Sequence, residues 1–226
     1  MIVKLKRSTT VLEKGIPVLA VLLEIRGLII VKSDDYLNTE FETTIRETAE
    51  AFTTETIAKD KIVALIRAMF KSFGTDPTRW RPSSEAMIRR AVKEKSLYKI
   101  NSLIDINNIV SMRYRLPIGV YDMDRIAGDV VILDIGCSGE EFTGLTGRTY
   151  NAENKPILRD GEGIFGSPVV DSERTKITDI TRNAAAVIFS HIDEPVGHCI
   201  NAAEEYARLA RRVHTGVTVT RPVKAE

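Results

Sequence analysis

Cysteine, histidine and tryptophan are scarce in this 226-residue chain, which contains two, three and one of them. Cys137 and Cys199 lie far apart with no second pair of ligands, so the sequence offers neither a disulfide framework nor a zinc site. His191 and His198 flank an acidic turn, but their spacing matches no zinc motif. We therefore expect no metal and no cofactor.

Long apolar runs are also missing. The longest, Ile16 to Leu23, contains Pro17 and is followed by Glu24 and Arg26, so it is too short and too charged to span a bilayer. The amino terminus has no apolar signal core. A formal net charge of +1 argues against wrapping nucleic acid with the whole surface. We expect a cytoplasmic protein that contacts no membrane, and the oligomeric state stays open.

The rest of the composition is ordinary for a globular protein, with 43% apolar and 28% charged residues. Apolar runs rich in Val and Ile predict strands, whereas apolar positions at helical spacing predict helices. No repeat or linker interrupts them, so a single mixed α/β domain over residues 1–226 is the simplest interpretation. Strands are expected at residues 1–6, 18–23, 28–31, 118–121, 130–133, 157–158, 164–165, 184–189 and 216–220. Helices are expected at 38–52 (solvated), at 60–74 with Asp60 as N-cap, after Ser83 or Ser84, at 103–112 and at 196–213.

The segment Ile100-Asn-Ser-Leu-Ile-Asp-Ile-Asn-Asn-Ile-Val110 places polar side chains on an otherwise apolar helix. Asn101, Asp105 and Asn108 stand at i, i+4 and i+7 and therefore share one face. They are candidates for holding a ribose, an amino group or a water. The alternative is that they cap the helix and bind neighbouring backbone, as Asn and Asp often do.

A cluster of arginines follows the predicted helix at 60–74. Arg79, Arg81, Arg89 and Arg90 are candidate contacts to nucleic-acid phosphates, and Trp80 is a candidate for stacking on a base. The alternative is a solvated helix face, with Trp80 filling part of the core.

Further motifs come in a fixed order. Ile100–Val110 is followed by Leu116-Pro-Ile-Gly-Val-Tyr-Asp-Met-Asp-Arg-Ile126, by Asp160-Gly-Glu-Gly-Ile-Phe-Gly-Ser167 and by Thr175-Lys-Ile-Thr-Asp-Ile-Thr-Arg-Asn183. In this order the chain, over roughly residues 60–195, resembles the B3/B4 editing domain of the phenylalanyl-tRNA synthetase β subunit. Asp76-Pro-Thr-Arg-Trp-Arg-Pro-Ser-Ser84 resembles the leading segment of freestanding B3/B4 proteins. The resemblance implies a mixed-sheet α+β fold, and tRNA or aminoacyl-tRNA as the partner.

The resemblance also implies an activity, namely hydrolysis of the ester that joins a wrong amino acid to the terminal ribose of tRNA. Such editing is needed because a pocket discriminates weakly between near-isosteric side chains. The chemistry requires a water held against the ester carbonyl, donors for the oxyanion, and departure of the ribose hydroxyl.

Candidate residues follow the matched segments. Glu162 is the candidate general base, Thr175 and Thr178 are hydroxyl donors, and Arg174 could pair with a phosphate or carboxylate. The expected cleft is lined by Asn101, Asp105, Asn108, Tyr121, Asp122, Gly163, Ile164, Phe165 and Arg174. The alternatives are an exposed turn glutamate, a tight hairpin with Phe165 in the core, an Arg–acid pair, and Thr178 as an N-cap.

The sequence departs from the synthetase pattern at two positions. Gly119 stands where the synthetase has the histidine of its editing pocket, and Pro168 stands where it has a glutamate. Three hypotheses therefore remain. The first is trans-editing hydrolysis of misacylated aminoacyl-tRNA. The second is a non-catalytic module that binds RNA or an amino-acid-like ligand on the same fold. The third is hydrolysis of an unrelated small acyl ester or amide.

Overall fold

The computed structural model describes residues 3–32 and 34–226. The helices are α1 (Thr9–Glu13), α2 (Asp35–Ala51), α3 (Lys61–Ser72), α4 (Ser83–Glu94), α5 (Ser102–Tyr114) and α6 (His198–Val213), with short 3-10 turns η1 (Ile57–Lys59) and η2 (Met123–Arg125). The strands are β1 (Lys4–Arg7), β2 (Val18–Arg26), β3 (Ile118–Asp122), β4 (Val130–Ile135), β5 (Glu141–Thr143), β6 (Thr149–Asn151), β7 (Pro156–Asp160), β8 (Gly163–Gly166), β9 (Asn183–His191), β10 (Thr218–Val219) and β11 (Val223–Lys224).

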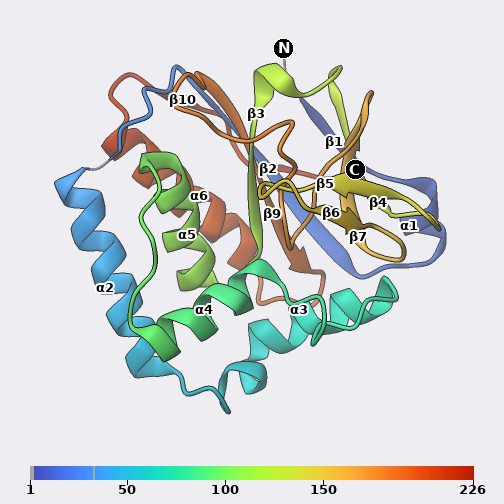
Figure 1. Cartoon of the computed structure of the whole chain (residues 1–226), viewed down its shortest axis with the longest axis horizontal. Helices are drawn as coiled ribbons and strands as arrows, with labels where there is room; N and C mark the ends of the chain where they lie inside the picture. Colours follow the sequence, from blue (N-terminus) through green and yellow to red (C-terminus); the bar gives the residue numbers. More distant parts are fainter. Residues whose placement is uncertain (1–2, 33) are drawn as a thin grey trace.

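An antiparallel sheet of order β10-β2-β9-β3 carries the core, with β11 also paired to β2. Its two longest strands, β2 and β9, pair over nine residues from Val18 opposite His191 to Arg26 opposite Asn183. Both strands read as near-continuous apolar runs because they are buried along almost their whole length. Helices α5 and α6 pack against this sheet, with α2 and α4 beyond α5 (Figure 1).

A second sheet of order β1-β4-β7-β8 lies on the other side of the central strands (Figure 1). β1 runs parallel to β4, while β4, β7 and β8 are antiparallel, so the sheet is mixed. A small β5–β6 hairpin accompanies it. The two sheets meet where Tyr121 of β3 packs edge-on against Phe165 of β8, with ring centroids 4.8 Å apart at 87°. This mixed α/β architecture confirms the predicted fold class.

Local capping explains where the main helices begin. The Asp60 carboxylate accepts hydrogen bonds from the backbone N–H groups of Ile62 and Val63 at the start of α3, as predicted. The Asn101 side chain accepts one from Ile104 N–H at the start of α5. Both caps satisfy donors that a helix end would otherwise leave unpaired.

Two predicted elements were wrong in part. Residues 28–31 form no strand, because the chain turns at Gly27 with a φ of +78° and leaves the sheet after Leu28 N–H donates to Arg182 O. The helix predicted at 38–52 spans Asp35–Ala51, and it is not solvated all round, since Leu37, Phe41 and Ile45 are buried along one face. Met1 and Ile2 of the first predicted strand lie outside the described residues, and β1 begins at Lys4.

No helix in the described part of the chain is both long and apolar enough to cross a membrane.

Candidate functional site

The junction of β3 and β8 brings the matched segments together. Tyr121 is fully buried there, and its ring lies between two glycines from different segments. A Cβ atom built on Gly119 would lie 2.0 Å from the Tyr121 hydroxyl oxygen, and one built on Gly166 would lie 2.4 Å from it. Real Cβ atoms do not approach so closely, so both positions require glycine while the Tyr121 ring keeps its place. The ring therefore fills the space at position 119 where the resemblance expects a histidine.

Asp171 is the residue at this junction that the sequence did not single out. Its carboxyl turns inward toward Tyr121, and one carboxyl oxygen lies 3.0 Å from the position that a Cβ atom added to Gly119 would occupy. Burial raises the pKa of the Asp171 carboxyl to about 7, although interactions with the Tyr121 hydroxyl and the Val120 N–H partly offset this. Asp171 lies between the matched segments Asp160–Ser167 and Thr175–Asn183 and belongs to neither.

The Tyr121 hydroxyl faces this carboxylate without reaching the geometry of a full hydrogen bond. Burial and then the negative charge of Asp171 raise the pKa of Tyr121 well above its ordinary value. A phenol in such a position stays protonated and keeps an O–H available for donation. The pair thus combines a carboxyl that titrates near neutrality with a neutral donor.

Asp122 and Thr175 hold the surrounding segments together. Asp122 N–H donates to Thr175 O over 2.8 Å, and the buried Thr175 hydroxyl donates to Phe165 O over 3.2 Å. The Asp122 carboxylate accepts from the Thr181 hydroxyl over 2.7 Å. Thr178 N–H in turn donates to the Thr181 hydroxyl oxygen over 3.0 Å. These predicted site residues do come together, but each is engaged in bonds that fix the backbone around the Tyr121–Asp171 pair.

Arg174 is engaged in an ion pair with Asp160. Its guanidinium donates to both carboxylate oxygens, over 3.0 and 2.8 Å, and the Arg174 hydrogen bonds help to lower the pKa of Asp160 against the opposing effect of burial. Glu162 is 65% exposed and lies 3.3 Å from the same guanidinium. Gly163, with a φ of +126°, begins β8 directly after the hairpin turn, Ile164 beside it is half-buried, and Phe165 is buried in the core. The arrangement is the Arg–acid pair and tight hairpin of the alternative interpretation.

The polar residues of α5 lie apart from this junction. Asn101 caps the helix, and the buried Asp105 carboxylate accepts from Ile100 N–H over 2.9 Å. Burial raises the pKa of Asp105. The Asn108 side chain is half-buried and makes no hydrogen bond within the described part of the chain. Asn107, which the spacing did not select, donates to Ile118 O over 3.2 Å and so links α5 to β3.

The arginines divide into two groups. Arg67, Arg81 and Arg89 surround the buried carboxylate of Glu85, at 2.9, 3.6 and 2.9 Å. Arg79 is 87% exposed, with Asp76 at 3.9 Å, and Arg90 is exposed.

Trp80 is half-buried on the same side of the molecule. It packs edge-on against Tyr150, with ring centroids 5.8 Å apart, and carries the Lys155 ammonium 4.4 Å above its ring. Burial lowers the pKa of Lys155. One face of the indole is therefore already occupied by a cation.

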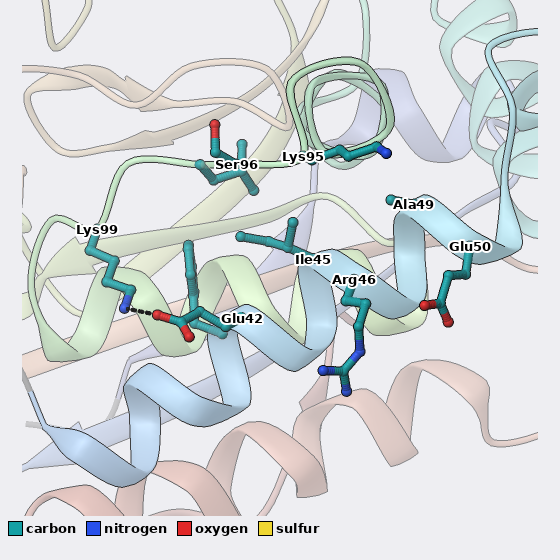
Figure 2. Close-up of a pocket in the computed structure, with 10 residues that line it drawn as sticks. Glu42, Ile45, Arg46, Ala49, Glu50, Lys95, Ser96 and Lys99 are labelled. Atoms are coloured by element: carbon teal, nitrogen blue, oxygen red, sulfur yellow. Dashed lines mark hydrogen bonds and ion pairs between the residues drawn. The ribbon is translucent and has the colours of Figure 1, made fainter.

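A separate groove of about 420 Å³ lies between α2 and the connection from α4 to α5. Figure 2 shows Ile45 pointing from α2 toward this connection and Lys99 bonded to Glu42 across one end. None of the predicted site residues lines this groove. Among residues 3–32 and 34–226, no group of three His, Cys, Asp or Glu side chains is arranged to hold a metal ion.

The sequence is similar to phenylalanine–tRNA ligase β subunits. It is 31% identical over 104 residues to that of Geobacter metallireducens, covering 45% of this chain and 13% of the relative. It is 33% identical over 88 residues to that of Bartonella quintana, covering 38% and 11%. The chain thus matches only a small part of these longer relatives.

The fold is similar to a solved structure of the same kind of subunit. An N-terminal fragment of the phenylalanyl-tRNA synthetase β subunit from Pyrococcus horikoshii aligns with a TM-score of 0.50 and 14% sequence identity. The alignment covers 99% of this chain and 54% of the fragment, and it supports the fold alone.

The sequence profile of the B3/4 domain matches residues 65–196. This span is more than half of the chain, and it contains the β3–β8 junction with Gly119, Tyr121, Gly166 and Asp171. The profile, the partial relatives and the fold therefore agree. The chain belongs to the B3/4 domain family.

Proposed function

We propose that this B3/4 chain binds the aminoacylated end of a tRNA and hydrolyses the ester in trans, at the junction of β3 and β8. The observation that carries the proposal is the Asp171 carboxyl, which lies beside Tyr121 where the matched segments meet and titrates at about pH 7. A base is most effective when its pKa lies near the working pH. Strongly perturbed carboxyls of this kind are concentrated at functional sites.

In the proposed step, the Asp171 carboxylate takes a proton from a water that attacks the ester carbonyl. The Tyr121 hydroxyl donates to the oxygen on which negative charge develops. Collapse of the tetrahedral species expels the ribose oxygen, which takes up the proton from Asp171. The products are the free amino acid and the tRNA with its terminal hydroxyl restored. No covalent intermediate is needed.

Access to the pair requires the Tyr121 ring to move, because the residue is fully buried between Gly119 and Gly166. The two glycines carry no side chain that would block such a rotation. We therefore place the ester carbonyl beside Asp171, at a position that the hydroxyl of the rotated Tyr121 ring still reaches. The exposed cations Arg79 and Arg90 are the proposed phosphate contacts, since Arg81 and Arg89 are held by Glu85.

A second candidate function is non-catalytic binding of RNA or an amino-acid-like ligand. Two observations favour it. The Tyr121 ring fills the space at the junction, and Gly119 and Pro168 stand at the positions where the resemblance expects catalytic groups. Glu162, Thr175 and Arg174, the residues first considered for catalysis, also make bonds within the protein.

The test offers the purified protein a panel of aminoacyl-tRNAs and measures both deacylation and tRNA affinity at several salt concentrations. Asp171→Asn is compared with Asp35→Asn, which changes an exposed carboxyl at the start of α2. Deacylation above buffer that Asp171→Asn abolishes, with tRNA affinity retained, supports the hydrolase. Binding without turnover supports the non-catalytic module. Activity on free amino-acid esters without tRNA binding supports the small-ester hydrolase. If the protein shows no binding and no turnover, all three hypotheses are contradicted.

A further inference from the structure

Asn107 of α5 places a polar side chain against the outer edge of β3, next to the Tyr121–Asp171 junction. β3 is the last strand of its sheet, and α5 packs beside it (Figure 1). Asn107 is 7% exposed, and its amide nitrogen donates to Ile118 O over 3.2 Å. A helix side chain thus covers part of the edge at which another strand could pair.

Only the nitrogen of this amide is paired. Ile118 O can only accept a hydrogen bond, so the Asn107 side chain must turn its NH2 group toward it, and this fixes the direction of the amide oxygen. That oxygen, Oδ1, is buried and has no hydrogen-bond partner within residues 3–32 and 34–226. Leaving a buried acceptor without a donor costs free energy. Inside a binding site, such an atom is a candidate contact for a donor on the ligand.

The Asp171 carboxyl lies on the same edge of β3. It interacts with Val120 N–H, and Val120 follows Ile118 by two residues. The backbone groups of alternate residues point to the same side of a strand. Pro117 O accordingly points the other way and accepts from an amide of β9. Ile118 O and Val120 N–H are therefore neighbours on the outer edge, and the amide of Asn107 lies next to the proposed base.

The substrate has a donor that suits this position. The acyl part of every aminoacyl ester carries an α-ammonium group, whatever its side chain. The nitrogen of this group is two covalent bonds from the ester carbonyl carbon. A carbonyl placed beside Asp171 therefore brings the ammonium group to the neighbouring position on the edge, where Asn107 Oδ1 lies.

We propose that Asn107 Oδ1 accepts a hydrogen bond from the α-ammonium group and makes the site selective for aminoacyl esters whose amino group is free. An acylated amino group, as in N-acetylaminoacyl-tRNA or peptidyl-tRNA, is bulkier and uncharged and is disfavoured. Hydrogen bonds to charged groups are the stronger ones. The inference rests on the proposed ester hydrolysis and gives Asn107 a role in substrate binding rather than in bond cleavage.

The test compares an aminoacyl-tRNA that the protein hydrolyses with the same molecule after N-acetylation of its amino acid. The wild type should show the higher kcat/KM on the free ester. Asn107→Leu has a similar volume and no acceptor. It should lower kcat/KM for the free ester about 10- to 100-fold, the effect of losing a hydrogen bond to a charged group, and leave that for the acetylated ester nearly unchanged. The matched control is Asn201→Leu, at an exposed position on α6, which should keep the wild-type ratio.

The ratio of the two kcat/KM values separates binding from structure, because a general loss of folding or activity lowers both values alike. The comparison on the wild type needs no variant. Equal values for the two esters in the wild type contradict the inference and leave the hydrolysis standing. A preference for the free ester that Asn107→Leu keeps also contradicts it, since bulk alone then excludes the acetyl group. No turnover of either ester contradicts the proposed hydrolysis and the inference with it.

Discussion

The hydroxyl oxygen of Tyr121 occupies the volume that a side chain at Gly119 would need, since a Cβ there would lie only 2.0 Å away. The position at which the resemblance expects a histidine is thus filled from two residues further along the same strand. The combination of Gly119 and Tyr121 places a phenol, rather than an imidazole, next to Asp171, and this pair defines the chemistry available at the junction. Five predictions about the junction and the basic surface can be checked.

The first prediction concerns the fit of Tyr121 against Gly119. Gly119→Ala is expected to destabilise the fold by ~1–3 kcal/mol, as overpacking of a well-filled core typically does. In a Tyr121→Ala background the same substitution should cost much less, because the clashing ring is gone. Urea unfolding of the two single variants and the double variant measures the coupling. Equal costs in both backgrounds would show that the ring does not occupy this space.

The second prediction concerns pH and Asp171. Its carboxyl has a pKa of about 7 in the folded protein, above the ordinary value of 3.8, so the folded state holds the proton more tightly than the unfolded state does. The free energy of unfolding of the wild type should therefore fall relative to that of Asp171→Asn as pH rises from about 4 to 7, by at most ~1.4 kcal/mol per pH unit. It should then stay level above pH 7. A difference independent of pH over this range would contradict the burial of the carboxyl.

The third prediction concerns Glu85, which is 1% exposed among three arginines. Glu85→Gln leaves their charges without a counter-ion and is expected to destabilise the fold. The loss should be less than the ~3–5 kcal/mol seen on breaking fully buried pairs, because the arginines are 21–39% exposed. Thermal unfolding measures it, with Arg79→Ala as a control that should leave the midpoint unchanged. Equal midpoints for both variants would show that the cluster contributes nothing to stability.

The fourth prediction separates phosphate contacts from structural arginines. Arg79→Ala and Arg90→Ala should each weaken RNA binding and reduce the slope of log affinity against log salt concentration by about one. Neither should alter stability, since both side chains are exposed. Binding isotherms at several salt concentrations provide the measurement. The control variant is Lys6→Ala, which removes an exposed cation on β1. An unchanged slope in both variants would remove these two arginines from the proposed RNA surface.

Local signals in the sequence were enough for part of this structure. The N-cap role of Asp60 depends on two amides within three residues of it, so the sequence alone identifies it. The buried face of α2 also had a signal, because Leu37, Phe41 and Ile45 recur every four residues. The many threonines and glutamates between them obscured it. Leu28 to Val31 has the composition of a strand, but the chain turns at Gly27 and leaves the sheet, so these residues form no strand.

The junction itself could not be predicted in the same way. The pKa of Asp171 depends on Tyr121 and on burial between segments that are some fifty residues apart in the chain. On α5, helical spacing showed that Asn101, Asp105 and Asn108 share a face, but not which face meets β3. That contact belongs to Asn107. Of the three arginines around Glu85, Arg81 and Arg89 stand four residues on either side of it and had a readable signal, whereas Arg67 lies on another helix.

The fifth prediction tests the central claim, ester hydrolysis at the Tyr121–Asp171 pair, and its most direct measurement is the pH dependence of single-turnover deacylation. With an aminoacyl-tRNA that the protein hydrolyses, the rate above buffer should rise with pH and level off above an apparent pKa of about 7, because the Asp171 base acts only when deprotonated. Asp171→Asn should abolish the rate at every pH while leaving tRNA affinity unchanged. A rate that Asp171→Asn retains with the same pH profile would contradict the assignment.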